Sequence, residues 1–241
     1  MDKPGHIVFD CERMKYPFTG LYYFCLHLGK SLLQQQTADE LMLYLPASID
    51  PGLFAQTLPV LRQHPLHKFS FPRTVPYLLW HCTYQGSNYF PRNKKLKIVL
   101  TVHDLNFLHD EDKPAYRKKR YLNSLAKKVA RADAVVAISE FVKAHLMAQV
   151  DVPAQKIHVV YNGCNVSDAV QAVAPVNAPA KPFLFTIGTI VPKKNFHVLP
   201  ACLLNNEYDL VIAGIVQDED YLQKIKAKAE ELGVAHRVHF A

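Results

Sequence analysis

Short apolar runs that alternate with helical patterns constrain the fold of this 241-residue chain more than any other feature. Apolar residues recur at helical spacing in 22–34, 117–131 and 140–149. Apolar strands that alternate with helices are typical of a mostly parallel sheet, so we predict an α/β fold. Residues 46–76 show no pattern that we can assign. The runs that we interpret as strands are 6–10, 41–45, 78–82, 97–103, 134–139 and 157–161.

A stretch with three prolines and little charge divides the chain at 172–182, and this composition predicts a linker. We therefore predict an N-terminal domain at 1–171 and a partial C-terminal domain at 183–241. After the linker the strand–helix pattern begins again, which indicates the βαβαβ half of a doubly wound sheet. Its expected elements are strands at 183–187, 210–213 and 237–240, a short helix from Asn195 that Pro200 weakens, and a helix at 218–232.

The turn after the first strand of this second part indicates an anion site. The strand runs into Gly188, and Lys193 and Lys194 stand just ahead of the expected helix start at Asn195. Lysines are disfavoured there because the positive end of the helix dipole repels them. Two cations beside a helix N-terminus are explained by a bound anion, for which a phosphate is the usual candidate.

A second candidate site lies at the end of the strand at 97–103. His103 and Asp104 occupy the carboxyl end of this strand, where open α/β sheets bind their ligands. A histidine there can donate a hydrogen bond to a sugar hydroxyl or to a developing negative charge. The alternatives are a His–Asp pair that only stabilises the loop, and a metal cluster completed by His109 and Asp110. The metal interpretation is weak because His109 and Asp110 lie in a loop rich in acids.

Composition narrows the classes of function. The net charge is +7, and it is uneven, since residues 92–131 hold twelve Lys or Arg against four Asp or Glu. This concentration favours either a solvated basic face or a surface for an anionic partner such as a membrane. We expect no nucleic-acid binding, because no known module or interleaving of aromatic and basic residues occurs. Five widely spaced cysteines without a C-x-x-C pair argue against disulfides and zinc. No apolar run approaches the roughly 20 residues of a membrane span. The N-terminus lacks the apolar core of a signal peptide, so we expect a cytoplasmic protein.

The order of seven segments is more specific than any one of them. They are FTGLYY (18–23), HDL (103–105), ISEF (138–141), VYNG (160–163), the proline-rich linker, IGTIVPKKN (187–195) and LVIAG (210–214). This series resembles the family-4 glycosyltransferases of the GT-B fold, a large group of retaining enzymes. The resemblance covers the chain except roughly 50–73. It implies two Rossmann-like domains that face each other across a cleft, the first for an acceptor and the second for a nucleotide-diphosphate sugar.

The resemblance also assigns expected roles to residues. Gly20 lies in the loop that approaches the donor phosphates, where the absence of a side chain permits close contact. His103 contacts the transferred sugar, and Lys194 neutralises the donor diphosphate. Lys193 stands where close relatives carry arginine, and Thr189 replaces an arginine that many members have after the glycine of this strand. Gly188 and Asn195, from the same turn, are expected to line the donor site.

The implied reaction is sugar transfer, with retention, from a nucleotide-diphosphate sugar to a cell-envelope or polysaccharide acceptor. Cations and helix dipoles stabilise the leaving diphosphate, so neither a metal nor another cofactor is expected. Many members act on lipid-linked acceptors, and the basic segment 113–131 suits peripheral contact with the inner membrane face. A nicotinamide-dependent enzyme is disfavoured because no G-x-G-x-x-G follows a strand.

The end of the sequence bears on the expected activity. Relatives continue for about 100 residues after the strand at 237–240, and that region carries the motif that grips the donor sugar. We therefore expect the second Rossmann-like domain to be incomplete and its half sheet to expose apolar surface. The chain alone is expected to bind a donor poorly and to be inactive or only weakly active as a glycosyltransferase. The alternative is a non-catalytic remnant or an acceptor-binding module.

Overall fold

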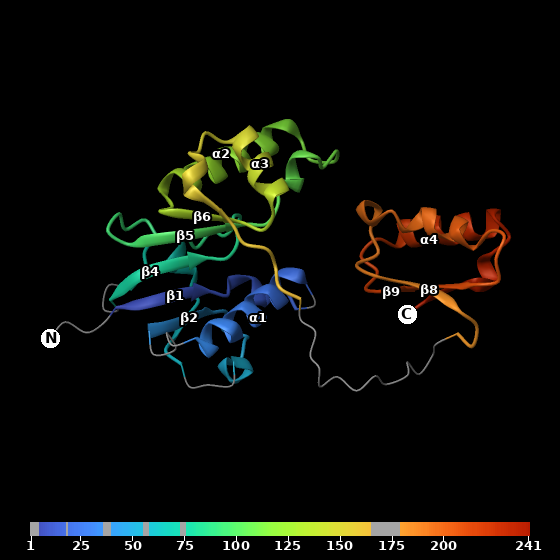
Figure 1. Cartoon of the computed structure of the whole chain (residues 1–241), viewed down its shortest axis with the longest axis horizontal. Coiled ribbons are helices and arrows are strands. Elements are labelled where there is room, and N and C mark those ends of the chain that lie inside the picture. Colours follow the sequence, from blue (N-terminus) through green and yellow to red (C-terminus); the bar gives the residue numbers. More distant parts are fainter. Residues whose placement is uncertain (1–4, 18, 36–39, 55–57, 73–75, 165–178) are drawn as a thin grey trace. The chain divides into compact units, whose positions relative to one another are not determined.

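The chain forms two units, Met1–Val166 and Ser167–Ala241 (Figure 1). The structure is a computed structural model, and it describes residues 5–17, 19–35, 40–54, 58–72, 76–164 and 179–241. Most of the predicted linker, residues 172–178, lies outside these ranges, so the domain boundaries at 171 and 183 stay predictions. The first residue of the FTGLYY segment, Phe18, also lies outside them.

The first unit is built on a seven-stranded parallel sheet with the strand order β3-β2-β1-β4-β5-β6-β7. The predicted α/β class is confirmed, and six of these strands fall where the apolar runs predicted them. The seventh, β3, lies in the stretch 46–76 that had no assignable pattern. The elements are β1 (His6–Asp10), α1 (Gly20–Gln34), β2 (Leu41–Leu45), β3 (Val60–Arg62), β4 (Tyr77–Cys82), β5 (Lys97–Val102), α2 (Ala115–Arg131), β6 (Ala134–Ala137), α3 (Glu140–Gln149) and β7 (Ile157–Val159).

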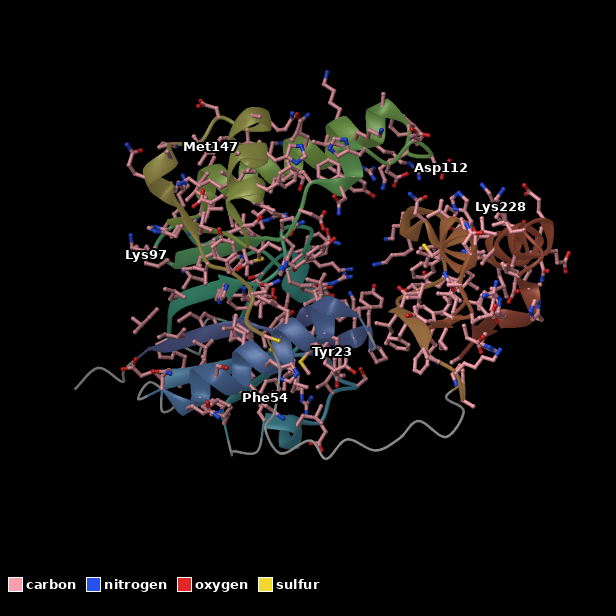
Figure 2. The ribbon with its side chains drawn as sticks, turned by 45° about the vertical axis from the view of Figure 1, so that its right-hand side comes forward. Tyr23, Phe54, Lys97, Asp112, Met147 and Lys228 are labelled. Carbon is pink, nitrogen blue, oxygen red and sulfur yellow. The ribbon has the colours of Figure 1, made fainter. Side chains whose placement is uncertain are left out.

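Alternating side chains of the sheet build two apolar cores in the first unit. In β1, Val8 packs into the core that contains residues of α2 and α3, whereas Phe9 packs into the core that contains residues of α1. This alternation follows from the period of two in a β-strand. Gly29 in α1 meets Phe54, labelled in Figure 2, so closely that a Cβ atom at Gly29 would lie 2.5 Å from the Phe54 ring. The helix can approach this ring only with glycine at that position.

Side-chain caps begin two of these helices. The hydroxyl of Ser139 accepts a hydrogen bond from the Val142 N–H at 3.2 Å at the start of α3. The Thr19 hydroxyl does the same for α1, accepting from the Tyr22 N–H at 3.3 Å. Both caps lie after the carboxyl end of a strand, so they also place the loops at the edge where ligands bind in such sheets. No helix of the described residues combines the length and apolarity that a bilayer crossing requires.

The second unit is a three-stranded parallel sheet with the order β10-β9-β8, and α4 packs on one face of it (Figure 1). The predicted helix from Asn195 is wrong in type: Phe196–Leu203 is a 3₁₀ helix, η8, that contains Pro200. Proline cannot donate the i→i−4 hydrogen bond of an α-helix, and its ring clashes with the carbonyl four residues earlier. The other elements are β8 (Phe183–Ile187), the 3₁₀ turn η7 (Pro192–Lys194), β9 (Asp209–Ala213), α4 (Glu219–Glu231) and β10 (Val238–Phe240).

The second sheet exposes apolar side chains on its edge strand β8, as the sequence predicted for a half sheet. Phe183, Phe185 and Ile187 are 39, 58 and 73% exposed. These residues alternate along the strand, so they share the face opposite to the one that packs against α4 and η8. Among the described residues of this unit, nothing covers that face.

Candidate functional site

The candidate site residues of the first unit lie at the carboxyl ends of its strands. His103 directly follows β5, and Gly20 begins α1 after the loop that leaves β1. Phe24, one turn into α1, places its ring edge-on against the ring of His103, with 4.7 Å between the ring centroids. The fold therefore brings the start of α1 and the end of β5 together, as ligand binding at this edge of a parallel sheet requires.

The contacts of His103 determine which of its ring nitrogens can meet a ligand. Its Nε2 lies 2.8 Å from the backbone oxygen of Thr83. Because a carbonyl oxygen can only accept, Nε2 carries the proton and Nδ1 of the neutral ring is an acceptor. Burial lowers the pKa of His103, which favours this neutral form. The prediction that His103 donates to a sugar hydroxyl therefore needs correction, because the single N–H of the neutral ring already donates to the Thr83 oxygen.

Gly20 lies where a side chain would meet nothing. A Cβ atom built on Gly20 has no other atom within 4 Å, so packing within the first unit does not require glycine there. The residue also lines a cavity of about 460 Å³ between α1 and the strands, together with Tyr23 (Figure 2), His81 and Thr101. This volume suits a small-molecule ligand or part of one. The open space agrees with the predicted close approach of a ligand to Gly20.

In the second unit, the turn after β8 places a lysine over a glycine. A Cβ atom on Gly188 would lie 3.6 Å from Cε and 3.8 Å from Nζ of Lys194, so the ammonium group lies beside the backbone of Gly188. Lys193 and Lys194 are exposed and form no ion pair among the described residues. Two unpaired cations beside a bare backbone are a suitable arrangement for an anion.

Asn195 has a structural part in this turn. It adopts the left-handed conformation, with φ 58° and ψ 24°, between η7 and η8. Its own N–H donates to the Pro192 oxygen at 3.0 Å. The amide of His197, the second residue of η8, donates to the Tyr221 hydroxyl at 3.2 Å. Because this amide is engaged, the start of η8 contributes less to an anion site than the sequence suggested, and the two lysines contribute more.

The structure assigns a role to a glycine that the sequence analysis had left without one. Gly214 follows β9, has φ +149°, and would place a Cβ atom 2.0 Å from the oxygen of Gly188. No other residue fits there, because the side chain would collide with the backbone of the neighbouring strand end. The LVIAG segment thus supports the turn of Gly188 from the side. The signal in the sequence was a glycine at the end of an apolar strand.

Two buried carboxyl groups at the end of β1 were also missed. Asp10 and Glu12 are 1 and 4% exposed, and Asp10 Oδ1 accepts the N–H of Glu12 at 2.9 Å. Burial raises the pKa of Asp10 well above its ordinary value.

The predicted alternative of a metal cluster around His103, Asp104, His109 and Asp110 finds no support, because the described residues contain no group of three such side chains close enough to hold a metal ion.

Comparison with known proteins identifies the family. Residues 41–168, more than half of the chain, match the family model described as Glycosyltransferase Family 4. The chain belongs to this family. The expected family-4 resemblance is thereby confirmed from a region that includes His103 and the ISEF and VYNG segments and ends at residue 168, before β8.

Two curated proteins are similar to this family-4 chain. The O-antigen chain mannosyltransferase B of Escherichia coli is 23% identical over 225 residues, which cover 80% of this chain and 58% of the relative. The O-antigen chain mannosyltransferase RfbU of Salmonella typhimurium is 27% identical over 145 residues, which cover 59% of this chain and 38% of the relative. The matched region thus spans less than two thirds of the length of either relative.

Solved structures support the fold. The Anabaena protein Alr3699/HepE, crystallised in complex with UDP, matches with a TM-score of 0.62 and 15% identity over 98% of this chain and 68% of its own. The lipopolysaccharide outer core galactosyltransferase WaaB matches with a TM-score of 0.55 and 18% identity over 98% of this chain and 66% of its own. At such identities the similarity shows the fold alone, and it confirms the predicted GT-B class with its α/β units.

Proposed function

We propose that this family-4 chain takes part in the transfer of a sugar, with retention, from a nucleotide-diphosphate sugar to a cell-surface polysaccharide acceptor. The observation that carries the proposal is the ammonium group of Lys194 beside the bare backbone of Gly188. The mannosyltransferase relatives and the UDP complex of a structural neighbour support a nucleotide-sugar donor and an O-antigen type of acceptor.

In this proposal the two lysines stabilise the leaving group. A nucleoside diphosphate carries increasing negative charge as the bond to the sugar breaks, and prearranged cations stabilise that charge without a metal. Lys194 is the principal contact because it lies over Gly188, and Lys193 assists as a second point charge. Gly20 permits the close approach of the phosphates at the edge of the first unit.

His103 has a defined part in the same reaction. With Nε2 donating to Thr83, the neutral ring offers Nδ1 as an acceptor for a hydroxyl of the transferred sugar. The hydrogen bond orients the sugar and places no positive charge beside it. The lowered pKa of His103 keeps the ring in this acceptor form at neutral pH.

The basic helix α2 provides a surface for an acceptor held at a membrane. Residues 113–131 contain no Asp or Glu, and Arg117, Lys119, Arg120 and Lys127 are exposed. Each well-placed cation contributes about 1 kcal/mol of attraction to an anionic leaflet. We propose peripheral contact through this exposed face.

The donor-site proposal is tested with Lys194→Met, which removes the charge and keeps the aliphatic stem. Saturation-transfer difference NMR with UDP and with GDP measures the dissociation constant, and it suits weak binding. Loss of a charge-assisted contact of 1.5–3 kcal/mol predicts roughly 10- to 150-fold weaker binding. The control Lys224→Met removes an equal charge from the exposed side of α4 and should leave binding unchanged.

We expect Lys194→Met to bind the nucleotide more weakly than Lys193→Met, and both variants to bind it more weakly than the control. Equal affinity in the wild type and in Lys194→Met would reject the donor site. Retention is tested separately from the anomeric proton of the first product formed, observed by ¹H NMR. A product with the anomeric configuration opposite to that of the donor would reject that part of the proposal.

A further inference from the structure

The side-chain amide of Gln85 clamps the backbone around His103. Its Oε1 accepts the N–H of His103 at 3.2 Å, and its Nε2 donates to the oxygen of Asp104 at 2.9 Å. Gln85 lies in the loop that leaves β4, whereas His103 and Asp104 follow β5, the neighbouring strand. One amide thus satisfies a donor and an acceptor on consecutive residues of a loop, and holds this loop in one conformation.

Lys128 in turn holds the loop of Gln85. Its ammonium group donates to the backbone oxygen of Gln85 at 2.8 Å and to that of Ser87 at 2.6 Å. Ser87 is 1% exposed, and burial lowers the pKa of Lys128. Among the described residues Lys128 forms no salt bridge. A mostly buried lysine that serves two carbonyl oxygens orders this loop, because leaving either acceptor unpaired would cost stability.

A third contact acts directly on the ring of His103 and determines which ring nitrogen carries the proton. The backbone oxygen of Thr83, two residues before Gln85, accepts from Nε2 of His103 at 2.8 Å. The hydroxyl of Thr83 donates to the oxygen of Asp10 at 2.6 Å, so the loop is also attached to the end of β1. The loop of residues 83–87 therefore contacts both the backbone and the ring of His103, and Lys128 stabilises that loop from α2.

We propose that Gln85 and Lys128 are positioning residues for His103, which hold its ring so that Nδ1 is presented to the ligand. The inference rests on the proposed function, in which His103 meets the transferred sugar. Gln85 acts directly on the backbone of His103, whereas Lys128 acts one step further away through the oxygen of Gln85. Neither residue needs to touch the sugar. The effect of each should therefore appear in the state of the His103 ring before it appears in transfer.

The first measurement is ¹⁵N NMR of the histidine rings, which distinguishes the two neutral tautomers without any substrate. In the wild type His103 should be the Nε2–H tautomer at neutral pH. The variant Gln85→Met keeps the length of the side chain and removes both polar atoms, and Lys128→Met removes the ammonium group. In both variants we expect a mixture of the two neutral tautomers of His103, with His81 and Asp104 as the other ionisable groups near the ring.

The chain offers a matched control. Lys127→Met removes the same charge from the adjacent, exposed position of α2, and it should leave the ring of His103 unchanged. The conservative variant Gln85→Glu keeps an acceptor for the His103 N–H but loses the donor for the Asp104 oxygen, so its effect should be intermediate. If Gln85→Met fails to fold, Lys128→Met and Gln85→Glu still test the inference.

The second measurement is turnover in the sugar-transfer reaction. A misplaced ring predicts a kcat about 10- to 100-fold lower with little change in the KM for the donor. An unchanged ring spectrum in both Gln85→Met and Lys128→Met, or an equal change in Lys127→Met, would overturn the positioning role. A displaced ring with unchanged turnover would instead overturn the role that the proposed function gives to His103.

Discussion

His81 makes the stability of the first unit depend on pH. It lies in β4, with Nε2 2.8 Å from the Thr101 hydroxyl and its ring edge-on to Phe9. Burial, together with the neighbouring His103, lowers its pKa from 6.5 to about 4. The unfolded chain therefore takes up a proton at a higher pH than the folded chain does.

The sign and the size follow from linkage. Because the folded pKa is depressed, the contribution of His81 to stability is fully present above pH 6.5 and is lost as the pH falls toward 4. Between pH 7 and pH 5 the two pKa values predict a loss of up to about 2 kcal/mol in the free energy of unfolding. The cavity beside His81 admits water, so this value is an upper bound.

The chain carries its own probe for this effect. Trp80, the only tryptophan in the sequence, is fully buried in β4 next to His81, so its fluorescence reports the unfolding of the first unit. Urea titrations at pH 7 and pH 5 should show the predicted loss in the wild type. His81→Gln cannot titrate and can still bond to Thr101, so the difference between the two pH values should shrink by about 1–2 kcal/mol. An equal pH dependence in both proteins would refute the reasoning.

Two further predictions concern ligand contact. Gly20→Ala should leave the midpoint of thermal unfolding unchanged or slightly raised, because the new Cβ atom meets nothing and alanine favours a helix. Nucleotide binding, measured by NMR, should weaken. Unchanged binding would remove Gly20 from the donor site. The second prediction replaces Lys119, Arg120 and Lys127 with glutamine. The triple variant should bind anionic phosphatidylglycerol vesicles less tightly by about 3 kcal/mol, as measured by co-sedimentation. Equal sedimentation of the variant and the wild type would exclude α2 as the membrane contact.

Local patterns predicted most of the fold because a buried strand is recognisable in the sequence as an unbroken run of apolar residues. The five residues of β2 are all buried, and an unbroken apolar run announced them. By contrast β3 has three residues, none of them buried, so its pairing with β2 decides its conformation. The type of helix at η8 was missed because Pro200 forbids the α-helical bond without specifying what replaces it.

The site was predictable where one segment carries it and unpredictable where contacts are distant in sequence. Gly188 and Lys194 lie six positions apart, and a motif identified both. Gln85 lies 18 positions from His103, in a loop without periodicity. Nothing in the sequence around Gln85 predicts that its amide binds the backbone of His103. The tautomer of His103 depends on a backbone oxygen, which has no signature in a sequence.

The basic segment shows how one sequence pattern can divide into two functions. Its lysines and arginines suggest a single charged face, yet Lys128 donates to the loop of Gln85, and Arg131 donates to the backbone oxygens of Asn93 and Leu96 at 2.5 and 2.7 Å. These inner cations stabilise loops at the strand ends, whereas Lys119 and Lys127 remain exposed. A helix turns by about 100° per residue, so adjacent lysines 127 and 128 necessarily face different surroundings. The exposed cations can therefore serve an anionic surface while Lys128 holds the loop beside His103, and substitutions at 127 and 128 separate the two roles.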